Sequence, residues 1–189
     1  MKLVVGLGNP GRRYADTRHN VGFRVIEELA QRYGAGGARR RFHGELTEVT
    51  REGTRILLLR PQTYMNRCGL SVLEARDYFR IDNADLLVVC DDFNLPLAKL
   101  RVRAKGSSGG QKGLEDIIRC LGTEHFPRLR IGIGPPPAGC DVAEYVLSRF
   151  GSDEVSAVQA AIARAADAAA MWAVEGIESC MNHYNAAGD

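Results

Sequence analysis

Residues 2–11 read Lys-Leu-Val-Val-Gly-Leu-Gly-Asn-Pro-Gly, a short apolar run followed by closely spaced glycines. The β-branched residues in the run predict a buried β-strand over residues 2–7. Apolar residues then recur with helical spacing from Val21 to Tyr33. Thr17 can cap this segment and Gly34 can end it, so we expect a helix over about 17–33. The N-terminal part of the chain therefore predicts a strand joined to a helix by a polar, glycine-rich loop.

The rest of the chain continues this alternation. We expect strands over residues 42–50, 54–59, 85–90, 99–105 and 128–133, and helices over 66–79, 113–121, 153–175 and from 177 onward. Glu52-Gly53 predicts a hairpin between the first two of these strands. Interleaved strands and helices predict an α/β fold, and the hairpin favours a mixed, mostly parallel twisted sheet flanked by helices. No repeat or linker marks a boundary, so a single domain over residues 1–189 is expected.

The composition is that of an ordinary globular protein. The chain has 189 residues, 45% of them hydrophobic and 25% charged, and a formal net charge of +2. This balance argues against disorder, and the small total at first argues against a nucleic-acid partner. No apolar stretch approaches the ~18 residues of a membrane span. Five widely spaced cysteines without a CxxC pair indicate free thiols in a reducing cytoplasm and disfavour zinc.

The first loop contains an apparent nucleotide motif. Residues 6–11, Gly-Leu-Gly-Asn-Pro-Gly, fit the pattern GxGxxG after a strand. In a dinucleotide site the helix opens at the glycines, whereas here the polar residues 12–16 intervene. The acidic residue expected about 20 positions on should end a second strand, but Glu27 and Glu28 lie inside the predicted helix. A glycine-rich turn that presents Asn9 is therefore favoured over an NAD or NADP site.

Polar residues gather where the predicted strands end, the place where α/β sheets bind ligands. His19 follows the first strand, and Asp91 and Asp92 follow the strand over 85–90. Histidine is the natural proton carrier near neutral pH, and a neighbouring carboxylate can hold its tautomer and stabilise the imidazolium. Asn9 and Asn66 can orient a carbonyl or a water, although a turn role for Asn9 and a helix-cap role for Asn66 remain open. No nucleophile motif is present, so direct activation of water by His19 is the simpler chemistry.

The net charge hides a basic segment. Residues 99–130 carry eight Lys or Arg and three Asp or Glu, so this segment is +5 and the rest of the chain is −3. Lys99, Arg101, Arg103 and Lys105 alternate with apolar residues, which places them on one face of a strand. Arg128 and Arg130 repeat the spacing, and the glycine-rich turn over 106–110 opens a helix whose amides can bind anions. Together these features favour a phosphate-binding surface over an ordinary solvated strand.

Taken together, the motifs resemble one family. They are residues 5–11 (VGLGNPG), Tyr14, residues 17–22 (TRHNVG), residues 64–66 (YMN), Asp91-Asp92 with Leu95-Pro96, and residues 128–134 (RLRIGIG). In this order they resemble bacterial-type peptidyl-tRNA hydrolase from Lys2 to about Tyr184. The resemblance implies a cytoplasmic, monomeric α/β enzyme without cofactor or metal. It would hydrolyse the ester between a peptide, or an N-blocked amino acid, and the 3′-terminal ribose of tRNA, and so release the tRNA for reuse in translation.

The resemblance also implies roles for individual residues. His19 would be the general base, Asp91 its support, Asn66 the group that orients water or the scissile carbonyl, and Asn9 the group that recognises the peptide backbone. Further residues would hold the substrate: Tyr14 and Tyr64 in the cleft, Arg103 and Arg130 on tRNA phosphates.

One part of the family pattern is changed. Where the family usually has Gly-His-Asn-Gly, this chain has Gly110-Gln111-Lys112-Gly113. Lys112 thus replaces a substrate-binding asparagine and offers donors but no acceptor, though it could bind a phosphate or the ester region by its charge. The change leaves a second hypothesis open, an RNA-binding relative with impaired catalysis. A nucleotide-binding oxidoreductase, suggested by GxGxxG alone, is a third.

Overall fold

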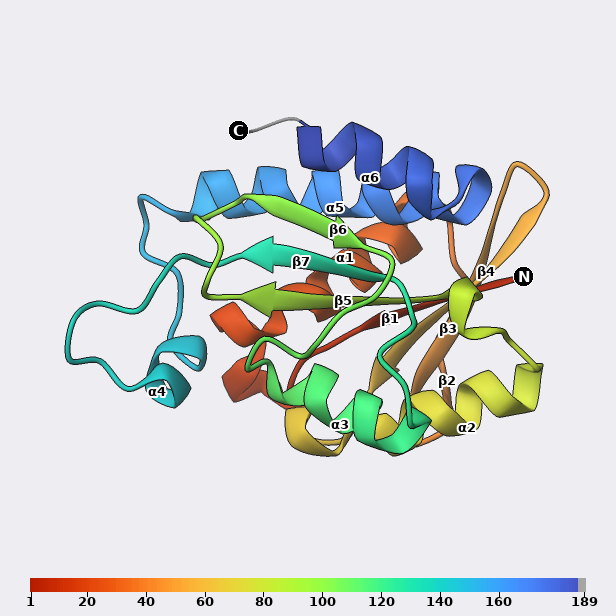
Figure 1. Cartoon of the computed structure of the whole chain (residues 1–189), viewed down its shortest axis with the longest axis horizontal. Coiled ribbons are helices and arrows are strands. Elements are labelled where there is room, and N and C mark those ends of the chain that lie inside the picture. Colours follow the sequence, from red (N-terminus) through yellow and green to blue (C-terminus); the bar gives the residue numbers. More distant parts are fainter. Residues whose placement is uncertain (187–189) are drawn as a thin grey trace.

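The computed structural model describes residues 1–186 and contains one seven-stranded sheet with helices on both faces (Figure 1). The strands are β1 (Lys2–Gly6), β2 (Arg39–Arg41), β3 (Gly44–Arg51), β4 (Thr54–Pro61), β5 (Leu86–Asp92), β6 (Leu100–Arg103) and β7 (Arg128–Gly132). The α-helices are α1 (Val21–Arg32), α2 (Gly69–Phe79), α3 (Lys112–Leu121), α4 (Val142–Val146), α5 (Val155–Glu175) and α6 (Ile177–Ala186). Short 3₁₀ turns are η1 (Arg12–Tyr14), η2 (Arg18–Asn20), η3 (Met65–Arg67) and η4 (Asn83–Asp85).

The sheet is mixed, as the sequence predicts. Its order is β2-β3-β4-β1-β5-β7-β6, and the four central strands β4, β1, β5 and β7 run parallel. The β2–β3–β4 and β6–β7 pairings at its two ends are antiparallel. The carboxyl ends of the four parallel strands consequently meet at one edge, which in such sheets is where ligands bind.

Two hydrophobic layers cover the sheet. Along β1, Val4 packs into the core on the side of α1, α5 and α6, while Leu3 and Val5 pack into the core on the side of α2 and α3. Figure 1 shows α5 and α6 on one side of the sheet and α2 and α3 on the other. Because both faces are buried, the central strands read as continuous apolar runs rather than as alternating ones.

Two glycines bring the start of α1 against the strand ends. A Cβ on Gly6 would lie 2.2 Å from the carbonyl oxygen of Gly22, and a Cβ on Gly22 would lie 2.5 Å from the carbonyl oxygen of Val89. The glycines after β1 therefore serve close helix–strand packing. Helix α1 begins only at Val21, after two 3₁₀ turns, so the dinucleotide arrangement suggested by GxGxxG is not formed.

The structure differs from the sequence prediction where local signals were weak. The strand expected over 42–50 begins at Gly44, because Phe42 and His43 form the left-handed turn of a β2–β3 hairpin, each with φ 52°. Strand β2 consists of three exposed arginines and carries no apolar alternation by which it could be predicted. Helix α4 was also missed. It has five residues, and its signal was the capping pair Asp141 and Glu144.

Candidate active site

A cleft of about 810 Å³ opens at the carboxyl ends of the parallel strands. Seven of the residues singled out from the sequence line it: Asn9, Tyr14, His19, Tyr64, Asn66, Asp91 and Lys112. They come from the loop and 3₁₀ turns after β1, the turn after β4, the end of β5 and the start of α3. Segments far apart in the sequence are thus brought together by the parallel arrangement of β1, β4 and β5.

His19 and Asp91 form a hydrogen-bonded pair in this cleft. The Nδ1 atom of His19 lies 2.8 Å from Oδ2 of Asp91, the penultimate residue of β5, which is 1% exposed. An ionised carboxylate can only accept, so Nδ1 carries the proton and Nε2 is left with its lone pair. Nε2 has no hydrogen-bond partner among residues 1–186 and belongs to a residue that lines the cleft. This is the arrangement of a general base supported by an acid.

Asn9 is held from two sides so that its amide group faces the cleft. Asn20 clamps its backbone, accepting from the Asn9 N–H and donating to its carbonyl oxygen, both at 2.9 Å. The Asn9 Oδ1 atom accepts from the Met65 N–H at 2.8 Å, which fixes the orientation of the amide. The Asn9 Nδ2 group is therefore left as a hydrogen-bond donor at the cleft. Asn20 and Met65 are site residues that the sequence hypothesis did not assign.

Gln111 is a further site residue without a predicted role. It is 6% exposed and caps α3, its Oε1 accepting from the Leu114 N–H at 2.8 Å. Its Nε2 lies 3.1 Å from Oδ1 of Asp91. Both oxygens of Asp91 therefore have a partner inside the protein. No capping signal marked it in the sequence, because glutamine is not among the residues that favour the N-cap position of a helix.

The residue before His19 anchors its loop. Arg18 is 7% exposed, and its guanidinium donates to both carboxylate oxygens of Glu154, at 3.0 and 2.6 Å, and to the carbonyl of Ile133. The hydrogen bond from Arg18 lowers the pKa of the Glu154 carboxyl. The 3₁₀ turn that carries His19 is thus tied to the segment ahead of α5 by a charge-assisted bidentate contact.

Aromatic and apolar groups form the cleft walls. The Tyr14 and Tyr64 rings meet edge to face with centroids 6.5 Å apart, and Tyr64 is 51% exposed. Helix α4 adds apolar side chains to the lining, together with Phe93. Asn66 is exposed at the cleft and does not cap α2, which begins after Cys68. Its amide is therefore available to a ligand.

The basic surface is smaller than the spacing suggests. On β6, Arg101 and Arg103 are exposed, as predicted. On β7, Arg128 is 1% and Arg130 is 9% exposed, so neither adds exposed charge to the phosphate-binding surface that the spacing predicts. Arg130 pairs with Asp92 at 3.0 Å and donates to the carbonyls of residues 107 and 108. Both arginines are buried because β7 lies between β5 and β6, and the loop over 106–110 folds over their guanidinium groups.

Cys90 lies next to Asp91 in β5 but is unsuited to nucleophilic attack. It is fully buried, and burial raises the pKa of its thiol to about 12. The thiol is therefore neutral at physiological pH, and only thiolates are good nucleophiles. Within residues 1–186 no group of three or more His, Cys, Asp or Glu side chains is placed to hold a metal ion.

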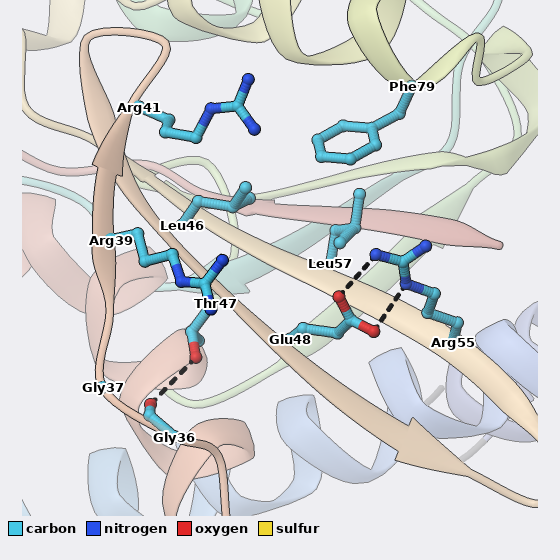
Figure 2. A pocket seen from close by; sticks show the side chains of 10 residues that line it. All are labelled: Gly36, Gly37, Arg39, Arg41, Leu46, Thr47, Glu48, Arg55, Leu57 and Phe79. Carbon is cyan, nitrogen blue, oxygen red and sulfur yellow. Dashed lines mark hydrogen bonds and ion pairs between the residues drawn. The ribbon is translucent and has the colours of Figure 1, made fainter.

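A second cavity, of about 250 Å³, is lined by residues of β2, β3 and β4 and by Phe79 of α2 (Figure 2). Arg39 and Arg41 extend into it from β2, and Glu48 is engaged by Arg55 at 2.6 and 2.7 Å. Its apolar floor consists of Leu46, Leu57 and Phe79. None of the residues singled out from the sequence lines this cavity, and its acid is already paired. The cleft at the strand ends is therefore the better candidate for chemistry.

Comparison with known proteins agrees with this assignment. A family model described as peptidyl-tRNA hydrolase matches residues 3–189. Peptidyl-tRNA hydrolases of Rhodopirellula baltica and Chloroflexus aggregans are each 50% identical to the chain, the first over 99% of it and 98% of the relative, the second over 98% and 99%. The crystal structure of peptidyl-tRNA hydrolase from Acinetobacter baumannii superposes with a TM-score of 0.92 at 37% identity, covering 98% of this chain and 95% of that one. With the fold, the cleft and the sequence in agreement over nearly its whole length, the chain belongs to the peptidyl-tRNA hydrolase family.

Proposed function

We propose that this enzyme hydrolyses the ester bond between a peptide, or an N-blocked amino acid, and the 3′-terminal ribose of tRNA. The observation that carries the proposal is the His19–Asp91 pair, whose Nε2 is left without an internal partner in a cleft of about 810 Å³. Membership of the peptidyl-tRNA hydrolase family supports the choice of substrate.

The geometry supports catalysis by activated water. His19 Nε2 takes a proton from water as the water oxygen attacks the ester carbonyl, and Asp91 stabilises the imidazolium that forms. The carbonyl oxygen becomes an oxyanion, toward which the exposed Asn66 amide can donate. The imidazolium then returns the proton to the leaving ribose oxygen, which yields the peptide acid and free tRNA. The Nδ2 group of Asn9 donates to a backbone carbonyl of the peptide, and Tyr14 and Tyr64 line its path.

The tRNA body binds through charge. Arg103 is exposed on the edge strand β6 and is the residue assigned to phosphate contact. Lys112 stands at the cleft, exposed and paired with Glu115 at 3.1 Å, and can exchange that partner for a phosphate near the ester. Arg130 contributes indirectly by holding the carbonyls of residues 107 and 108 in the loop ahead of α3.

Further parts of the proposal concern the state of the protein. We propose a single-domain monomer that acts without metal or cofactor in the cytoplasm. The five free cysteines support a reducing compartment. Among residues 1–186, no helix combines the length and apolarity needed to cross a membrane. The retained His19–Asp91 pair favours hydrolysis over the catalytically impaired RNA-binding alternative.

The test is release of N-acetylated amino acid from acylated tRNA by wild type and His19→Ala. General-base catalysis contributes about 10²–10⁴-fold, so the variant should lose that much of kcat while still binding tRNA. A rate within a few-fold of wild type would refute the mechanism. Binding of tRNA by wild type without any ester cleavage would favour the impaired alternative.

A further inference from the structure

We propose that Gln111 is a positioning residue for the reaction, and that it holds the Asp91 carboxylate in the orientation that keeps His19 in its base-competent tautomer. The inference rests on the proposed function. It starts from a chain of hydrogen bonds that runs from the α3 backbone to the imidazole. The Leu114 N–H donates to Gln111 Oε1 at 2.8 Å, Gln111 Nε2 donates to Asp91 Oδ1 at 3.1 Å, and Asp91 Oδ2 meets His19 Nδ1 at 2.8 Å.

The donor and acceptor of every hydrogen bond in this series are determined by the backbone N–H of Leu114, where the series begins. A backbone N–H can only donate, so the oxygen of the Gln111 amide must face Leu114 and its NH₂ group must face Asp91. Asp91 then accepts from both sides, which requires the proton of neutral His19 to reside on Nδ1. An ionised Asp91 requires the Nδ1–H tautomer wherever it contacts the imidazole, so the α3 backbone acts through Gln111 by holding the carboxylate in that contact, which leaves Nε2 free for water.

The position of Gln111 is also mechanically constrained. Its backbone is the N-cap of α3, and the helix start lies close against the floor of the cleft, because a Cβ on Gly113 would come within 2.6 Å of Met65 Sδ. Farther along α3, the Asp116 carboxylate accepts from the Gly69 N–H at 2.7 Å and so joins α3 to α2. The amide that contacts Asp91 is therefore fixed by two helices rather than by a flexible loop.

Without the Gln111 donor, Asp91 Oδ1 would be a buried acceptor with no partner among residues 1–186. The carboxylate could then rotate, and Asp91 would no longer be held in a single orientation toward His19 Nδ1. Gln111 does not itself touch the reacting atoms, so its loss should lower kcat and leave KM largely unchanged.

Three variants separate this role from a purely structural one. Gln111→Glu keeps an acceptor for Leu114 but replaces the donor toward Asp91 with a carboxylate oxygen. Gln111→Ala removes both groups. Gln111→His can restore both, because a neutral imidazole has one donor and one acceptor on opposite sides of its ring. The three enzymes and wild type are compared by steady-state hydrolysis of N-acetylated aminoacyl-tRNA, below the melting temperature of each.

We expect kcat to fall by about tenfold or more in the Glu and Ala variants, since a hydrogen bond to a charged group is lost, with KM within about twofold. The His variant should stay within about threefold of wild type. Equal activity of wild type and Gln111→Glu would overturn the proposal. So would a Gln111→Ala enzyme that melts earlier but keeps its kcat, since Gln111 would then be a helix cap only.

A second readout does not depend on activity. In ¹⁵N spectra of histidine-labelled protein at a pH where His19 is neutral, wild type should show the Nδ1–H tautomer, and Gln111→Ala should show a mixture with the Nε2–H form. An unchanged tautomer in the Ala variant would refute the positioning role even if wild type proved inactive. An inactive wild type that still showed the tautomer shift would instead count against the proposed function alone.

Discussion

Replacing Asp91 by asparagine tests the hydrogen-bond chain at its centre. In Asp91→Asn the new amide must still accept from Gln111 Nε2, because Gln111 is itself oriented by the Leu114 N–H. Its NH₂ group then faces His19 Nδ1, which must become an acceptor. The imidazole proton moves to Nε2, the atom that has to take a proton from water, so the enzyme is folded but holds the wrong tautomer.

The expected loss of kcat follows from the free energy needed to restore the Nδ1–H tautomer of His19 in the variant. Turning the asparagine so that its oxygen faces His19 sets its NH₂ group against the NH₂ group of Gln111. Turning Gln111 as well sets that NH₂ group against the Leu114 N–H. Either way one buried contact is lost and at least one donor is left unpaired, each at a cost of about 1–3 kcal/mol. A total of roughly 2–6 kcal/mol corresponds to a loss of about 30-fold to 3 × 10⁴-fold in kcat.

The assay is single-turnover release of N-acetylated amino acid from tRNA at saturating enzyme, which isolates the chemical step from binding. Asp92→Asn is the matched control, since Asp92 is the next residue of β5 but pairs with Arg130 instead of His19. The control should lose thermal stability and keep most of the single-turnover rate. An Asp91→Asn rate within threefold of wild type would refute the tautomer argument.

Two further predictions concern the surface and the fold. Arg103→Ala should weaken tRNA binding and reduce the slope of log K against log salt concentration by about 0.7–0.9, one phosphate contact, while a minimal substrate without the tRNA body is hydrolysed normally. Arg40→Ala, an exposed arginine on the opposite edge strand, is its control, and equal losses in both variants would contradict a local phosphate site. Glu154→Gln should lower the free energy of unfolding by about 1–3 kcal/mol at pH 7, because Arg18 loses a charged partner. Since Arg18 lowers the pKa of Glu154 below 4.5, this stabilisation is present above that pH and is lost as the pH falls through the folded-state value. Urea denaturation at pH 7 and pH 3 checks this, and a stability difference that persisted unchanged at pH 3 would contradict it.

Local sequence patterns were enough to predict the central strands of the sheet and the polar residues at their ends. Central strands are apolar on both faces over most of their length, as residues 86–90 show, so a short continuous run was enough to find them. Asn9, His19 and Asp91 follow the ends of such strands or stand at them, and the geometry of a parallel sheet brings those ends together without further information. The resemblance of the motifs added the reaction, because spacing alone pointed only to an acid–base pair.

The tertiary structure decided which polar groups have partners. Period-two spacing placed Arg101 and Arg103 on one face of their strand and gave Arg128 and Arg130 the same spacing. It could not show that the loop over 106–110 covers the second pair while the first pair stays exposed. Gln111 lies 20 residues from Asp91 in the chain, and its contact depends on where α3 begins. Burial and hydrogen bonding are set by segments that are distant in sequence, whereas hydrophobic periodicity is local. For that reason the fold and the proximity of His19 to Asp91 could be predicted from the sequence, and the Gln111 contact that supports this pair could not.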